Sequence, residues 1–153
     1  MEGGTASNVF PDEAKFSGGF RYSDMENGRI VKEKLPEIIK NAAANYGCTT
    51  EFKFSDTEAF PTVNDPEMSA IAEESLRKVH PDMEGQYGMV MGGESMGLYF
   101  TKVPGCFAWI GMASKELGTD APHHNYLFEV DESMLKPALD LSLQFAYDFL
   151  SKK

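Results

Sequence analysis

The sequence predicts an α/β protein: a β-β-α-β unit over residues 1–59, followed by an α/β unit over residues 60–153. Segments that alternate apolar and polar residues, as half-buried strands do, are interleaved with segments whose apolar residues recur at helical spacing. A turn-rich stretch, FPTVNDP at residues 60–66, separates the two groups and marks the expected domain boundary. The 153 residues, 42% of them hydrophobic, suffice for one ordinary domain or two very small ones.

The first unit is expected to begin with a β-hairpin. Residues 5–10 are β-prone and end at Pro11-Asp12, which is a turn signal. Residues 14–23 alternate, and their apolar face comprises Ala14, Phe16, Gly18, Phe20 and Tyr22. Two such segments joined by a turn predict a hairpin whose apolar face needs a helix against it.

A helix and a further strand complete this unit. Asp24 is suited to cap the helix, apolar residues recur at helical spacing from residue 30 to 46, and Gly47 supplies a stop. Pro36 inside this run predicts a kink or a later start of the helix. Residues 49–57 are expected to form the last strand of the unit.

The second unit is expected to begin with a helix at Asp65-Pro66, because proline is favoured at the first helical position. Its apolar stripe comprises Met68, Ile71, Ala72, Leu76 and Val79, and it ends before His80-Pro81. Residues 87–91 predict a short strand. Gly92-Gly93 then leads into a short helix that runs through Tyr99.

A buried strand and a final helix follow. Residues 105–112 (GCFAWIGM) are nearly all apolar, as expected for a strand covered on both faces. The final helix is expected to open at Asp131 or Ser133. Its predicted inward residues are Leu135, Leu139, Ser142, Phe145, Ala146 and Phe149.

The charge balance argues against nucleic acid as a partner. The chain carries 14 Lys and Arg against 24 Asp and Glu, a formal net charge of −10, with no basic patch. Affinity for a phosphate backbone comes largely from such basic side chains. No apolar run approaches the roughly 20 residues that span a bilayer, so a membrane role and a membrane partner are not expected. The chain is expected to act in the cytoplasm.

The pair His123-His124 is the only histidine cluster, in a loop beside Pro122. A neutral imidazole is a good zinc ligand, but adjacent residues rarely bind the same ion, so at most one of the two is expected to face a site. The alternative is a pair of exposed loop histidines. Zinc sites normally need three or four protein ligands, and the chain adds only the isolated His80.

Three further positions could contact a ligand. Arg21, on the polar face of a predicted strand, could hold a carboxylate through two hydrogen bonds, or could be a solvated arginine. Asn8 could donate an amide hydrogen bond to a carbonyl, or satisfy turn backbone. Gly92-Gly93 allows a ligand to approach the backbone at a helix start, or forms only a turn.

The order of four sequence blocks resembles a known family. The blocks are GGTASNVFPDEAKFSGGFRYSD, FPTVND, MGGESMGLYFTKVPGCFAWIG and PHHNYLFEVDE. Together, over residues 3–150, they resemble the C-terminal part of the dinuclear metal amidohydrolases and carboxypeptidases, which include aminoacylases, hippurate hydrolase, auxin-conjugate hydrolases and glutamate carboxypeptidases. The resemblance implies that residues 1–59 are part of the lid or dimerisation domain and residues 60–153 the C-terminal part of the catalytic domain.

The resemblance also implies roles for the candidate residues. His123 is similar to the last metal ligand of the dinuclear zinc site. Arg21 falls on the lid arginine that binds the substrate carboxylate, and Asn8 on the lid asparagine near the scissile carbonyl. Gly92 and Gly93 match the loop whose backbone lines the pocket. The implied substrate is an N-acyl amino acid or a small peptide.

Parts of the family's pattern are absent. Its His-x-Asp block, bridging aspartate, Glu-Glu pair and lid histidine lie upstream of where this chain begins, and its Glu-Asp-Phe reads Glu94-Ser95-Met96. The resemblance therefore implies a chain that is inactive alone and does not retain the two ions. A homo-oligomer or a complementing N-terminal chain is expected. The alternative is a non-catalytic remnant that serves association or ligand binding.

Overall fold

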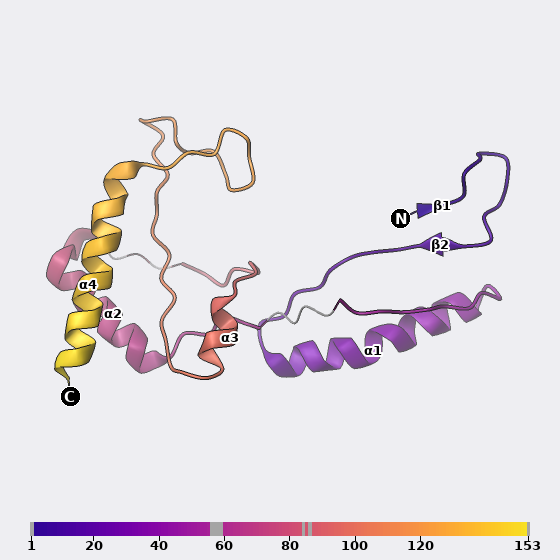
Figure 1. The fold of residues 1–153 in the computed structure, drawn as a ribbon, viewed down its shortest axis with the longest axis horizontal. Coiled ribbons are helices and arrows are strands. Elements are labelled where there is room, and N and C mark those ends of the chain that lie inside the picture. Colours follow the sequence, from indigo (N-terminus) through magenta and orange to yellow (C-terminus); the bar gives the residue numbers. More distant parts are fainter. Residues whose placement is uncertain (1, 56–59, 84, 86, 153) are drawn as a thin grey trace. The chain divides into compact units, whose positions relative to one another are not determined.

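A computed structural model describes residues 2–55, 60–83, 85 and 87–152 of the chain. Contacts divide the chain into two compact units, Met1–Asp56 and Thr57–Lys153, and each is described by itself. Figure 1 shows the helices and strands in chain order. They are β1 (Glu2–Gly3), β2 (Ala14–Lys15), α1 (Met25–Ala44), α2 (Pro66–Val79), the 3-10 turn η1 (Pro81–Met83), α3 (Met96–Phe100), the 3-10 turn η2 (Glu132–Met134) and α4 (Leu135–Ser151).

The first unit opens with a hairpin that is shorter than predicted. β1 and β2 pair antiparallel, with Glu2 opposite Lys15 and Gly3 opposite Ala14. The prediction of a strand over residues 5–10 is wrong. Gly4 adopts a φ of 73°, which turns the chain directly after β1, and residues 5–10 form the loop of the hairpin.

Helix α1 follows with the predicted caps. The Asp24 side chain accepts a hydrogen bond from the Asn27 backbone N–H at 2.8 Å, so the predicted N-cap is confirmed. Pro36 lies inside the helix, which starts at Met25, so a later start is wrong. Beyond the helix, Gly47 has a φ of 69°, the left-handed conformation expected of a stop signal.

Aromatic packing takes the place of the predicted third strand in this unit. Residues 49–55 are irregular, while residues 56 and 57 lie outside the described part of the chain. The Phe52 and Phe54 rings lie 4.8 Å apart between centroids, and Phe54 also contacts Phe20 at 6.3 Å. A strand needs a neighbour to satisfy its backbone groups, and in the described residues β1 and β2 pair only with each other.

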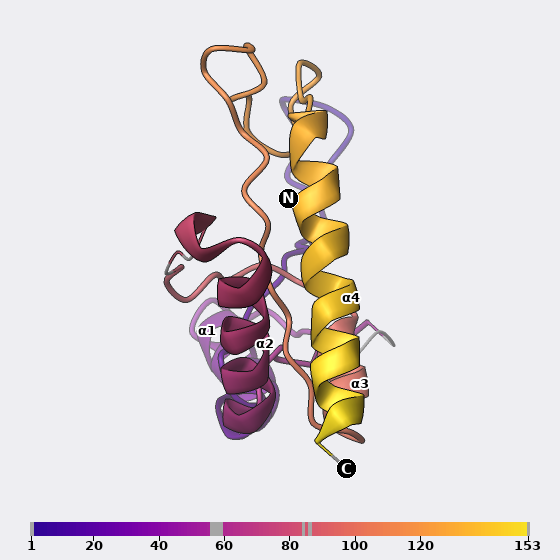
Figure 2. The ribbon, with the colours of Figure 1, turned by 90° about the vertical axis from the view of Figure 1, so that its left-hand side faces the viewer.

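The second unit is built on the pair α2 and α4, which lie side by side in Figure 2. Asp65 caps α2 as predicted, accepting hydrogen bonds from the backbone N–H groups of Glu67 and Met68 at 2.9 and 3.0 Å. The predicted apolar stripe of α2 is also confirmed, since Met68 and Ile71 are buried. This pair holds most of the buried side chains of the unit.

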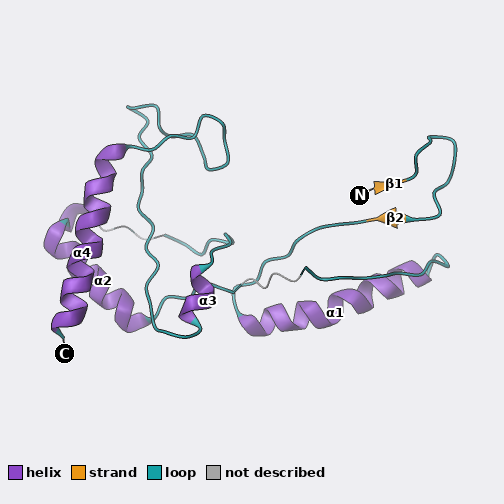
Figure 3. Cartoon of the chain, in the orientation of Figure 1, coloured by secondary structure: helices purple, strands orange, loops and turns teal. Residues whose placement is uncertain are grey.

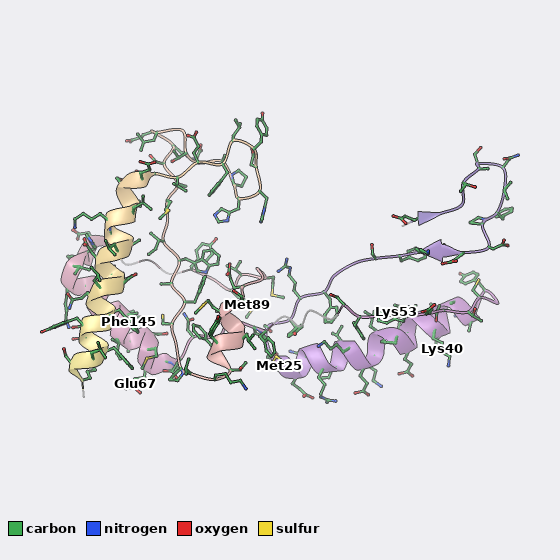
Figure 4. The ribbon with its side chains drawn as sticks, in the orientation of Figure 1. Met25, Lys40, Lys53, Glu67, Met89 and Phe145 are labelled. Atoms are coloured by element: carbon green, nitrogen blue, oxygen red, sulfur yellow. The ribbon has the colours of Figure 1, made fainter. Side chains whose placement is uncertain are left out.

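Helix α4 is rotated from its predicted orientation. Leu135 and Leu139 were expected inward but are 53% and 57% exposed, and Ser142, Ala146 and Phe149 are exposed as well; only Phe145 is half-buried. Figure 4 labels Phe145 on α4. The reason is polar: the Asp148 carboxylate accepts a hydrogen bond from the fully buried Ser75 hydroxyl at 2.7 Å. This contact turns the Asp148 side of α4 toward α2.

The segments 87–91 and 105–112 are irregular chain instead of the predicted strands, drawn as loop in Figure 3. The prediction of strands there is wrong. In 105–112 the first backbone groups bond to another loop: the Asn64 side chain accepts from the Phe107 N–H at 2.8 Å and donates to the Phe107 carbonyl at 3.0 Å. The Asp65 N–H also donates to the Gly105 carbonyl at 2.9 Å.

The short helix α3 forms where it was predicted and is held close to the start of the unit. Gly97 of α3 is buried, and a Cβ added there would lie 2.3 Å from the Phe60 carbonyl oxygen. The described residues thus contain mainly helix with a small amount of strand, which is compatible with an α/β class. None of the described helices combines the length and apolar character needed to cross a membrane.

Candidate functional site

His123 lies in an exposed loop of the second unit, between α3 and α4. Its ring contacts Phe128 edge-on, with centroids 4.8 Å apart and planes at 73°. The His124 ring is farther away, at 6.5 Å and 77°. His124 also has a φ of 63°, the left-handed conformation, so the chain turns between the two histidines and Asn125. The two rings therefore have different surroundings.

A turn after the histidines explains the contact with Phe128. The Asn125 carbonyl accepts a hydrogen bond from the Phe128 N–H at 3.0 Å, and the Asn125 side chain accepts one from the Leu127 N–H at 2.9 Å. Asparagine favours such turns because its side chain can bond to backbone two residues on. This local bonding brings Phe128 back against His123 and supports one side of the imidazole.

The residues present do not make up a metal centre. Among the described residues, no group of three or more His, Cys, Asp or Glu side chains could hold an ion. The isolated histidine, His80, bonds through Nε2 to the Asp140 carboxylate at 2.9 Å. His123 is thus one potential ligand, whereas a zinc site takes three or four.

Asn8 and Arg21 lie in the first unit. Asn8 is exposed in the loop between β1 and β2, and Arg21 is exposed in the extended chain that leads from β2 to α1. The hairpin loop encloses an open hollow of about 510 Å³, lined by residues 2–6, 9–13 and 15. Asn8 is not part of that lining. Within the described residues, no hydrogen bond or ion pair joins Asn8 to Arg21.

Gly92 and Gly93 lie in exposed chain before α3. A Cβ added at Gly92 would meet only the Val90 side chain, at an ordinary 3.5 Å, so packing inside this unit does not require glycine there. Ser95, at the start of α3, makes no side-chain capping bond. No hydrogen bond or ring contact in the described part of the chain connects these glycines to His123.

The perturbed carboxylates of this unit lie on the helix pair and not at the predicted site. Hydrogen bonds from Ser75 and Lys78 lower the pKa of Asp148, and hydrogen bonds from Lys136 and His80 lower the pKa of Asp140. Both carboxylates join α4 to α2. Their arrangement is structural, because each carboxylate is already matched to donors from these helices.

One residue with a clear structural role was not predicted. Asn64 lies in the FPTVND block and pairs through its side chain with both backbone groups of Phe107. Its place beside the cap Asp65 could have suggested a role in fixing the loop, since asparagine is the side chain that can imitate a peptide group. The sequence alone did not show which segment it would bond.

Comparison with known proteins links the chain to a hydrolase family. The profile of Peptidase family M20/M25/M40 matches residues 2–148. The N-acetylcysteine deacetylase of Bacillus subtilis is 33% identical over 140 residues, which cover 90% of this chain and 34% of that protein. Thermostable carboxypeptidase 1 of Saccharolobus solfataricus is 29% identical over 136 residues, covering 89% of this chain and 34% of that protein.

A third relative extends the range of named activities. The N-acetyldiaminopimelate deacetylase of Lactococcus lactis is 26% identical over 145 residues, covering 95% of this chain and 37% of that protein. The chain thus spans between 34% and 37% of the length of these three relatives. No solved structure matches the chain significantly.

Proposed function

Because the chain belongs to Peptidase family M20/M25/M40, we propose that it forms part of a metal-dependent amidohydrolase or peptidase that cleaves the amide bond of N-acyl amino acids or small peptides. The match over residues 2–148 carries this proposal. The relatives' names support the substrate class, since they describe a carboxypeptidase and the removal of an acetyl group from an N-acetyl amino acid.

In this proposal Arg21 and Asn8 hold the substrate. The Arg21 guanidinium is exposed and has the planar fork that binds a carboxylate through two parallel hydrogen bonds. Asn8, also exposed, offers an amide N–H₂ to a carbonyl oxygen. An N-acyl amino acid presents both groups, a free carboxylate and an amide carbonyl. The two residues would bind and orient the substrate in the complete site.

His123 supplies one metal ligand in this proposal, and the Gly92-Gly93 backbone lines the pocket. The complete family site takes two divalent ions, zinc by the chemistry of its ligands, which activate water for amide hydrolysis. The described residues do not complete such a site. We therefore expect further ligands and the general base to come from outside these residues, and the 153-residue chain alone to be inactive.

The two units take matching roles. Residues 1–59 would belong to the lid or dimerisation domain, with a β-β-α-β arrangement in the complete fold, and residues 60–153 to the catalytic domain. The partner would be a second copy of the chain or a complementing N-terminal chain, in the cytoplasm. The competing function is a non-catalytic module for association or ligand binding.

The activity of the isolated chain is the direct test of its sufficiency. The purified 153-residue chain is incubated with Zn²⁺ and N-acetyl amino acids, and the released amine is measured. We expect no release above buffer, because a metal-activated water needs both the ion and a carboxylate base. Release that a chelator abolishes would contradict the proposal that this chain is insufficient.

A chimera tests the residue roles. This chain replaces the matched 140 residues of the Bacillus subtilis N-acetylcysteine deacetylase, and deacetylation and bound metal are measured. We expect His123→Ala to lower metal content and activity by at least about a hundredfold in rate, since it removes a ligand. The control His124→Ala, its neighbour in the same loop, should keep both. Equal effects of the two changes would refute the assignment of His123.

The same chimera tests the substrate contacts. Arg21→Gln should raise KM for N-acetyl amino acids while bound metal stays unchanged, because it removes a contact to the substrate carboxylate. The matched control is Lys15→Gln, which removes an exposed cation from the same unit. An active chimera that is insensitive to Arg21→Gln would favour the non-catalytic reading of this segment.

A further inference from the structure

Helix α4 carries an exposed apolar stripe along its whole length. Leu135, Leu139, Leu143 and Tyr147 recur at every fourth position, and Leu150 continues the row. Their exposed fractions are 53%, 57%, 62%, 68% and 63% in the same order. These five residues, called the α4 stripe below, lie on one side of the helix because each helical residue advances the chain by about 100°.

The α4 stripe does not contribute to the packing of α4 on α2. The side that meets α2 carries Leu141, Phe145 and Asp148, which lie about half a turn away from the stripe. The polar contacts of Asp148 and Asp140 hold this orientation. Apolar surface left in water is unfavourable, and a continuous exposed row of large side chains is typical of an interaction surface.

We propose that the α4 stripe is the contact between two copies of this chain, with the two α4 helices antiparallel about a twofold axis at Leu143. The row suits such an axis. Leu139 and Tyr147 lie four residues on either side of Leu143, and Leu135 and Leu150 lie at nearly equal distances beyond them. An isologous contact needs this kind of self-complementary surface.

The charges beside the α4 stripe complement one another in the antiparallel arrangement. Exposed Glu132 precedes α4 and exposed Lys152 follows it, so each acidic start lies near the basic end of the second copy. Lys136, whose side chain is 78% exposed, lies near the last turn of the second copy's α4, which has no basic residue of its own. A cation there matches the free carbonyls of a helix end.

The parallel alternative lacks this match. It would place Glu132 beside Glu132 and Lys152 beside Lys152, and it would align the dipoles of the two helices in the same direction. The charge pattern therefore selects the antiparallel pair. This proposal concerns assembly and does not depend on the proposed catalytic function.

Sedimentation velocity of the whole chain at micromolar concentration tests the proposal. We expect a dimer, and we expect Leu143→Glu to raise its dissociation constant by about a hundredfold or more, because two carboxylates would meet at the axis. Leu117→Glu is the control, since Leu117 is equally exposed at 65% but lies in a loop outside α4. Circular dichroism checks that helix content is kept.

Charge reversal gives a second test that does not alter the apolar row. Glu132→Lys alone and Lys152→Glu alone should each weaken the dimer, and the double change should restore it, since it re-forms the pair with opposite polarity. A monomeric wild-type chain, a dimer that Leu143→Glu leaves intact, or charge changes that add without rescue would each overturn the proposal.

Discussion

At the scale of single residues, Asp148 explains more of the second unit than any apolar side chain. It is 8% exposed and accepts hydrogen bonds from Ser75 at 2.7 Å and from Gln144 at 3.0 Å, with the Lys78 ammonium also at 3.0 Å. A buried carboxylate is stable only when its oxygens are matched in this way. The rotation of α4, and with it the exposure of the α4 stripe, follows from satisfying this one group.

Stability should therefore depend on pH through Asp148 and Asp140. Both have a lowered pKa in the folded chain, Asp148 chiefly through the Ser75 hydrogen bond and Asp140 chiefly through Lys136. A depressed pKa gives stability that is complete above the unfolded pKa, about 3.9, and is lost as pH falls through the folded value. We expect the urea midpoint to be level near pH 6 and to fall steeply below about pH 4.

Asp148→Asn tests the origin of this dependence by urea unfolding at several pH values. The variant should have a lower midpoint at pH 6 and a shallower fall in acid, because the amide cannot take the charge that Lys78 matches. Glu129→Gln, a loss of one exposed carboxylate, is the control and should follow the wild type. An acid profile for Asp148→Asn as steep as the wild type's would rule out this account.

At the scale of elements, local signals predicted the helices and long-range pairing decided the strands. Asp24 and Asp65 cap α1 and α2 through hydrogen bonds to residues two or three positions away, so the sequence contains the whole interaction. Residues 105–112 have strand composition, but a strand exists only with a partner. Here Asn64, more than forty residues away, bonds to Phe107 instead, and no local pattern predicts that.

The candidate site shows the same division. Spacing alone left Arg21, Asn8 and His123 undecided between binding and solvation, and only the order of the four blocks gave them roles. The contact of His123 with Phe128 depends on the turn at Asn125, which local reasoning can predict once the histidine is singled out. The rotation of α4 was mispredicted because apolar periodicity gave no weight to Asp148.

Gly97 provides a test of how α3 is positioned. A Cβ there would lie 2.3 Å from the Phe60 carbonyl oxygen and 2.8 Å from that of Pro61, and backbone does not yield as a side chain tip does. In open space, Gly→Ala inside a helix is stabilising by about 1 kcal/mol. We expect Gly97→Ala instead to lower the free energy of unfolding by about 1–3 kcal/mol in urea. Gly111→Ala, where no atom lies within 4 Å, is the control.

At the scale of the whole molecule, the two units differ in how much they bury. Among the described residues, Gly28 is the one that is buried in the first unit, under the Tyr22 ring. The second unit buries Met68, Ile71 and Ser75 on α2, and residues 97, 119 and 148 beyond it. Helix α1 instead carries exposed ion pairs such as Arg29–Glu26, which add little stability in water.

Amide hydrogen exchange should therefore separate the units within one molecule. Local opening requires less free energy where few side chains are buried, so we expect α1 amides to exchange at least about tenfold faster than those around Ile71 to Ser75 in α2, after correction for intrinsic rates. The comparison is internal, because both helices have a capping aspartate and similar propensity. Equal protection of α1 and α2 would mean that the first unit draws its stability from contacts beyond its own buried residues, such as the second copy or complementing chain proposed for the complete protein.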